Sequence, residues 1–201
     1  MKREISIQRK TNEVEINGML NIDGRGESKI NTGINFLNHM LTLFAFFGFF
    51  DLKIKAKGDL THHANEDIAI SLGKAFAQGL KSGEGIKRFG FAACPMDKTL
   101  SQCIIDVSGR PSFSFEWNLS SNQDTPNPPA LGDYSFEDAY QFMEAFANSA
   151  KITIQVNARF DGDTHHLIEA IFKSFGIALD MATQIDKRRK GISSTKGVID
   201  F

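Results

Sequence analysis

The chain has 201 residues, of which 41% are hydrophobic, and its 23 basic and 24 acidic residues leave a formal net charge of −1. This length allows one domain or two small fused units, and near-neutral charge with scattered basic residues argues against nucleic acid or an anionic membrane as partner. No apolar run approaches the roughly 18 residues that cross a bilayer, and the charged amino end is unlike a signal peptide, so we expect a cytoplasmic protein. Cys94 and Cys103 lack metal-ligand spacing and are expected to be reduced.

The first half of the chain reads as strands, a buried helix, another strand and an amphipathic helix. Residues 3–33 alternate apolar and polar side chains, with turns expected at Asn17-Gly18 and at Gly24 to Gly26. Residues 34–50 are apolar enough for a buried helix, and we interpret the phenylalanines of residues 44–50 as the packing of this helix on a sheet rather than as a ligand site. An alternating segment then leads into a long amphipathic helix over 62–80.

The second half repeats this order. Alternating strands are expected over 91–117, followed by a connection rich in proline and asparagine at 121–133. A helix over 135–150, a strand over 151–158 and a helix over 165–182 complete the chain.

The two halves also share residues at constant offsets, which indicates an internal repeat. An offset of 100 aligns Phe36, Ala45, Phe46 and Ile54 with Phe136, Ala145, Phe146 and Ile154. An offset of 103 aligns His62, His63, Glu66, Ser71, Gly73 and Ala75 with His165, His166, Glu169, Ser174, Gly176 and Ala178. We therefore predict an α+β fold of two duplicated units, residues 1–85 and 86–201, each a β-sheet with helices packed on one face, together forming one compact domain.

Four of the five histidines lie in two copies of one pattern, His-His-x-x-Glu, at the start of the two long helices. A histidine and a glutamate three or four residues apart share a helix face, whereas adjacent histidines point about 100° apart. We infer that each pair serves two different metal ions, and that mixed imidazole and carboxylate ligation suits Mn, Fe or Zn. A lone pattern of this kind could equally cap a helix, but its duplication favours metal binding. The fifth histidine, His39, is the natural additional ligand.

A second set of residues is cationic or hydroxylic and lies beside glycine or proline. It comprises Arg88, Arg110, Lys173, Ser194 and Lys196. Guanidinium, ammonium and hydroxyl groups together suit a phosphate monoester. The segment STKG is not preceded by a GxxxxGK pattern, so a nucleotide-binding loop is not indicated.

Along nearly its whole length the chain resembles the imidazoleglycerol-phosphate dehydratase family. The segments RKTNEVEI, TGINFLNHML, HHANED, GIKRFG, DVSGRP, HHLIEAIFKS and STKG occur in the family's order. The resemblance implies units like the second domain of ribosomal protein S5, a 24-subunit homo-oligomer built from trimers, and two Mn²⁺ per chain. It also implies a lyase of histidine biosynthesis, which dehydrates D-erythro-imidazole glycerol phosphate to imidazole acetol phosphate.

The same resemblance assigns roles to individual residues. Metal ligands would be His39, His62, His63, Glu66, His165, His166 and Glu169, with Gln155 as an additional candidate. Glu13 would be the acid/base residue, and His63, Glu66, His166 and Glu169 would also serve catalysis. Phosphate would be bound by Arg88, Arg110, Lys173, Ser194 and Lys196.

The chain departs from the family pattern at several positions near these residues. Gln155 replaces a histidine ligand, which we expect to weaken one metal site, Asn38 replaces an aspartate, and Phe47 stands where a histidine is common. The loop before His62 is also short. Gln155 and the short loop motivate an alternative function, a non-catalytic or altered-specificity paralogue that keeps the oligomeric shell and binds an imidazole- or phosphate-bearing ligand. The metal ligands taken alone also allow a dinuclear hydrolase.

Overall fold

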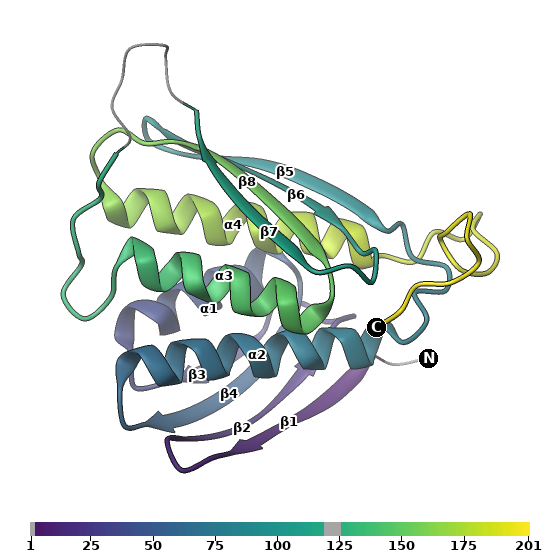
Figure 1. Ribbon diagram of the computed structural model, residues 1–201, viewed down its shortest axis with the longest axis horizontal. Helices are drawn as coiled ribbons and strands as arrows, with labels where there is room; N and C mark the ends of the chain where they lie inside the picture. The colour runs from purple at the N-terminus through teal and green to yellow at the C-terminus, as the bar shows by residue number, and fades with distance from the viewer. Residues whose placement is uncertain (1–2, 119–125) are drawn as a thin grey trace.

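The computed structural model describes residues 3–118 and 126–201, which form eight strands and four helices (Figure 1). The first half contains β1 (Glu4–Lys10), β2 (Val14–Asn21), β3 (Ser28–Asn31), α1 (Asn35–Phe47), β4 (Asp51–Gly58) and α2 (Thr61–Leu80). The second contains β5 (Phe89–Met96), β6 (Thr99–Asp106), β7 (Ser112–Trp117), α3 (Phe136–Ala150), β8 (Thr153–Arg159) and α4 (Thr164–Thr183). Residues 121–125 of the expected connection lie outside the described residues.

The two halves have the same sheet topology, which confirms the predicted duplication. The sheet of the first half has the order β1-β2-β4-β3, and that of the second has the order β5-β6-β8-β7. In each sheet the edge strand before the first helix of its half, β3 or β7, pairs in parallel, and the other pairings are antiparallel.

The four helices lie between the two sheets, so each sheet is covered on one face (Figure 1). Helix α2 packs against α3, and α1 packs against α4. Aromatic rings join both pairs: Phe44 stacks on Phe175 with centroids 4.9 Å apart, and Phe76 meets Phe146 edge-on at 5.5 Å. Because these rings come from opposite halves, the two units share a single core.

Two repeat-related glycines allow the helices to cross closely. A Cβ atom at Gly73 of α2 would lie 2.7 Å from the Phe146 carbonyl oxygen of α3, and one at Gly176 of α4 would lie 2.7 Å from the Phe44 carbonyl oxygen of α1. A larger residue at either position would push the helices apart. These contacts explain why both copies of the repeat keep glycine at this position.

The expected turn at Asn17-Gly18 is wrong, because both residues lie inside β2. Gly18 is needed there for close approach, since a Cβ atom would lie 2.3 Å from the carbonyl oxygen of Lys53 on β4. The reversal occurs instead around Thr11, whose hydroxyl accepts hydrogen bonds from the backbone N–H groups of Glu13 and Val14 at 3.1 and 3.0 Å. This turn places Glu13 at the tip of the first hairpin.

The interpretation of the phenylalanines in residues 44–50 is correct only in part. Phe44 and Phe50 are buried, but Phe46 and Phe49 are 62% and 59% exposed. Helix α1 has an apolar face toward the core, and its remaining aromatic side chains follow the helix around to the surface. None of the helices in the described residues combines the length and apolar character that a bilayer crossing requires.

Candidate active site

The motif on α4 opens the helix and lies over α1. The side chain of Asp163 caps α4 by accepting a hydrogen bond from the backbone N–H of His166 at 3.1 Å, which fixes the first turn. One turn later, Glu169 points back to His165, with Oε2 and Nε2 separated by 3.0 Å. The i, i+4 spacing read from the sequence therefore places this imidazole and carboxylate on one face.

Helix α1 adds His39 to this pair. Its Nε2 lies 3.4 Å from Glu169 Oε2, and one donor atom from each of His39, His165 and Glu169 lies within 4.8 Å of the others. Two imidazole nitrogens and one carboxylate oxygen form a donor set that fits a divalent transition metal. We refer to these three residues as the α4 cluster.

The carboxylate of the α4 cluster is held in its ionised form. Burial of Glu169 alone would raise its pKa, but the ammonium group of Lys173, 2.5 Å from Oε1, and the contacts with His165 and His39 lower the pKa below its ordinary range. The Glu169 side chain is only 9% exposed. A metal ion at this position would therefore meet a carboxylate that is already charged and largely removed from water.

The motif on α2 is more open. His62 Nε2 lies 3.8 Å from Glu66 Oε2, and the two side chains are 52% and 49% exposed. They line a surface pocket whose other wall is formed by α3, through Gln141, Glu144, Ala145 and Asn148. Within the described residues, no histidine from another helix joins His62 and Glu66 in a group that could hold a metal ion.

The second histidine of each pair turns away from its neighbour, as the helical geometry predicts. His63 Nδ1 lies 2.8 Å from Asp59 Oδ1 and 3.9 Å from Glu13 Oε2, and its hydrogen bond to Asp59 raises the pKa of His63. In α4, His166 Nδ1 lies 3.4 Å from Asp97 Oδ2 and 3.5 Å from Asp163 Oδ2. Each pair of rings has its centroids 6.0 Å apart.

Three of the carboxylates beside these outer histidines, those of Asp59, Asp97 and Asp163, were not singled out from the sequence. Asp59 and Asp163 stand four and three residues before their histidines, a spacing that was visible in the sequence. Asp97 comes from the turn between β5 and β6, far from His166 in the chain, so no local pattern could indicate it. Glu13 reaches His63 across the first hairpin, which places the expected acid/base residue beside an expected ligand.

The cationic residues do not all gather in one place within a chain. Arg88 donates to Asp106 at 2.7 and 3.1 Å and to the Ser193 carbonyl oxygen at 3.0 Å, and its backbone N–H bonds the Ala182 carbonyl oxygen in the last turn of α4. The exposed side chains of Arg110 and Lys196 and the partly exposed Ser194 belong to the loop after β6 and to the C-terminal segment that Arg88 anchors. Lys173 instead contacts Glu169.

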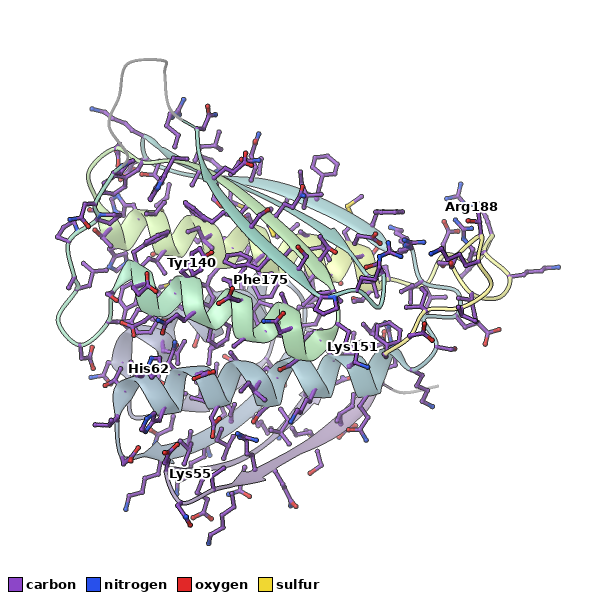
Figure 2. All side chains as sticks on the ribbon, viewed as in Figure 1. Lys55, His62, Tyr140, Lys151, Phe175 and Arg188 are labelled. Carbon is purple, nitrogen blue, oxygen red and sulfur yellow. The ribbon has the colours of Figure 1, made fainter. Side chains whose placement is uncertain are left out.

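The length of α4 separates these groups. Ala182 lies thirteen residues beyond Glu169, a rise of about 20 Å along the helix axis. Figure 2 shows a comparable separation, with His62 at the left end of the molecule and Arg188, in the C-terminal segment, at the right. One chain therefore presents its histidines and the Arg88 group at opposite ends.

Gln155 lies apart from the α4 cluster as well. It is exposed, while its neighbours Ile154 and Val156 are buried. Because the helices cover one face of the sheet, Gln155 lies on the other, between Ile104 of β6 and Ser114 of β7. Asn38 is engaged locally, since its side-chain oxygen accepts hydrogen bonds from the Thr32 backbone N–H and hydroxyl at 2.8 and 2.7 Å.

Comparison with known proteins gives a consistent result. The sequence model of the imidazoleglycerol-phosphate dehydratase family matches residues 32–179. Proteins named imidazoleglycerol-phosphate dehydratase from Pelobacter propionicus and Acetivibrio thermocellus are 46% and 45% identical, each over 99% of this chain and 100% of their own length.

Solved structures agree with this result. The crystal structure of the dehydratase from Staphylococcus aureus subsp. aureus N315 has a TM-score of 0.77 at 37% identity and covers 90% of this chain and 100% of its own. The dehydratase from Pyrococcus furiosus, in complex with (S)-C348, has a TM-score of 0.80 at 33% identity and covers 96% of this chain and 100% of its own. The chain belongs to the imidazoleglycerol-phosphate dehydratase family.

Proposed function

We propose that this protein is a hydro-lyase that converts D-erythro-imidazole glycerol phosphate into imidazole acetol phosphate in histidine biosynthesis. The observation that carries the proposal is the convergence of His39, His165 and Glu169 from two helices, in a chain that matches the dehydratases over nearly its full length. The same full-length match does not favour a paralogue that has lost the reaction, and no feature of the site favours a hydrolase.

We propose that the reaction requires two Mn²⁺ ions per chain. His39, His165 and Glu169 would hold one, and the remaining ligands would be His62, His63, Glu66 and His166, with Gln155 as an additional candidate. When bound, the ions supply Lewis acidity that stabilises negative charge on the imidazole ring of the substrate. The position of Glu13, 3.9 Å from His63, supports its role as the acid/base group for the proton that leaves the glycerol carbon.

Phosphate binding by Arg88, Arg110, Lys173, Ser194 and Lys196 implies that a site is shared between chains. The substrate extends roughly 10 Å from ring to phosphate, by ordinary bond lengths. It cannot span the distance of about 20 Å between Glu169 and the last turn of α4. A second copy must therefore bring its Arg88 end to the histidine end of the first, which supports a homo-oligomer, and we propose the 24-subunit assembly of trimers.

Two further features complete the proposal. Residues 1–85 and 86–201 are the halves of one domain, a division supported by the matching sheet orders on either side of it. The protein acts in the cytoplasm, in keeping with the small phosphorylated substrate.

The proposal is tested by stripping the purified protein with a chelator and supplying the substrate with and without Mn²⁺. We expect acetol phosphate to form only with the metal. A folded, Mn²⁺-loaded, oligomeric preparation that forms no product would contradict the proposed function.

A further inference from the structure

The two copies of the motif differ four residues after the glutamate. Lys173 stands four residues after Glu169, whereas Ile70 stands four residues after Glu66. The two positions are related by the same offset of 103 as the rest of the motif. Residues four apart are neighbours on a helix, and Lys173 Nζ lies 2.5 Å from Glu169 Oε1. One copy therefore has a built-in cation beside its carboxylate, and the other has an uncharged side chain.

Lys173 is held in place by contacts from β5 and α1, in addition to Glu169 on its own helix. Its side chain is 16% exposed. Its Nζ lies 3.6 Å from the sulfur of Met96 on β5 and 5.6 Å from the ring centroid of Phe47 at the end of α1, a cation–π distance. A lysine enclosed in this way is fixed more tightly than the solvated lysine that usually contacts a phosphate.

The two oxygens of Glu169 consequently have different partners. Oε1 contacts the ammonium group of Lys173, and Oε2 faces His165 at 3.0 Å and His39 at 3.4 Å. Only Oε2 belongs to the face on which the imidazole nitrogens converge. With Oε1 engaged, the carboxylate offers one oxygen to a metal ion rather than two.

We propose that Lys173 is a positioning residue that restricts Glu169 to one-oxygen ligation and so keeps a coordination position free for the substrate. This inference rests on the proposed function, because it concerns the same metal site. An ammonium group has three N–H donors, so the same lysine can still donate to a phosphate. The proposal adds a role toward Glu169 that the other phosphate-binding candidates lack.

The role predicts opposite changes in metal binding and in turnover. Replacing Lys173 by methionine removes a positive charge next to the metal and frees Oε1 for a second bond. We expect Mn²⁺ to bind roughly tenfold more tightly at one site per chain. We expect kcat at saturating substrate to fall about 10–100-fold, because the free position is lost.

The experiment measures Mn²⁺ binding to the metal-free assembly by the electron paramagnetic resonance signal of the free ion, alongside kcat and KM. The variants are Lys173→Met, Lys173→Arg, which restores the cation, and Lys74→Met. Lys74 is an exposed lysine of α2, so its replacement makes the same chemical change away from the site and should alter neither quantity.

Tighter Mn²⁺ binding with lower kcat in Lys173→Met, partly reversed in Lys173→Arg, would support the proposal. Unchanged Mn²⁺ affinity with a raised KM would show that Lys173 only contacts phosphate, and a parallel loss of affinity and turnover would show a merely structural role. Either result would overturn it. If the wild-type protein lacks turnover, the proposed function fails, while the affinity comparison still tests the positioning of Glu169.

Discussion

The two copies of the histidine motif have the same spacing but different surroundings. On α4 the glutamate is 9% exposed and receives a histidine from α1 and a lysine from its own helix. On α2 the glutamate is 49% exposed and shares its pocket with Gln141 and Glu144 of α3. The α1 position of His39 corresponds in the repeat to Ala139 of α3, so the two halves share the motif but not this histidine.

The comparison shows that the motif sets the spacing of the imidazole and carboxylate groups along a helix. Contacts from neighbouring helices decide whether one chain adds a further ligand group to them. The α4 cluster is preorganised within one chain. The α2 motif is open, as expected of a surface completed by a second copy.

The largest effect is expected from Glu169→Gln. The variant removes the anionic ligand of the α4 cluster and leaves Lys173 without its carboxylate, so we expect kcat/KM to fall at least about 1000-fold. The free energy of unfolding should also fall by about 1–3 kcal/mol, because a largely buried charge loses its partner.

The matched variant is Glu66→Gln. It should also abolish turnover, but its half-exposed side chain should change the free energy of unfolding by less than about 0.5 kcal/mol. Urea denaturation of both metal-free variants measures the contrast. Equal stability losses would mean that the two motifs do not differ in preorganisation.

His39→Ala is expected to have the next largest effect. Removal of one imidazole from the α4 cluster should weaken Mn²⁺ binding about 10–100-fold at one site and leave the other unchanged, which a competition titration against a chelator would resolve. Loss of binding at both sites would show that His39 supports the wider structure instead of one metal.

Gln155→His should sharpen the comparison at the second of the two proposed metal sites. An imidazole at this exposed position of β8 should tighten Mn²⁺ binding about tenfold in the assembled protein. Gln102→His, on the same exposed sheet face at β6, is the control and should have no effect. If both variants bind alike, Gln155 has no special relation to the metal.

The smallest effect concerns acid stability. The pKa of Glu169 is lowered from its ordinary value of 4.5 by Lys173 and its neighbours, against the opposing effect of burial. A lowered pKa in the folded state contributes stability above the unfolded value, and this stability is lost as the pH falls through the folded value. The free energy of unfolding of the wild type should therefore exceed that of Lys173→Met by about 1–2 kcal/mol near neutral pH.

The unfolded carboxyl is the same in both proteins, so that difference should shrink as the pH falls through the pKa of Glu169 in folded Lys173→Met, which the loss of the ammonium group raises. It should be gone below the lowered pKa of the folded wild type. Urea denaturation of the metal-free proteins from pH 3 to 7 measures it. A difference that does not shrink between pH 7 and pH 3 would mean that Glu169 is not the group responsible.

Much of the fold was predictable because the two halves of the chain repeat the same order of elements, so each half supports the interpretation of the other. The shared offsets anticipated two units, and Gly73 and Gly176 show the physical reason for one of the shared positions. The Asn17-Gly18 turn was wrong because a glycine required by a neighbouring strand has the same local signature as a glycine required by a turn.

The sequence predicted which residues make up the candidate site, but not how the fold groups them. Local spacing along a helix allowed Glu169 to share a face with His165 or His166, and in the structure it contacts His165, its i, i+4 neighbour. It could not show that Asp97 would reach His166 from another turn, or that α4 would separate Lys173 from Arg88. Such relations depend on packing between distant segments.

The central claim is that the histidine end of one chain and the Arg88 end of another form each site. The direct test mixes two inactive variants, Glu169→Gln and Arg110→Met, by coexpression and assembly into one oligomer. If the site is shared between two chains, about a quarter of the sites receive both intact contributions, and a matching fraction of wild-type activity should return. If mixed oligomers stay as inactive as either variant alone, each chain builds its own site and the account is contradicted.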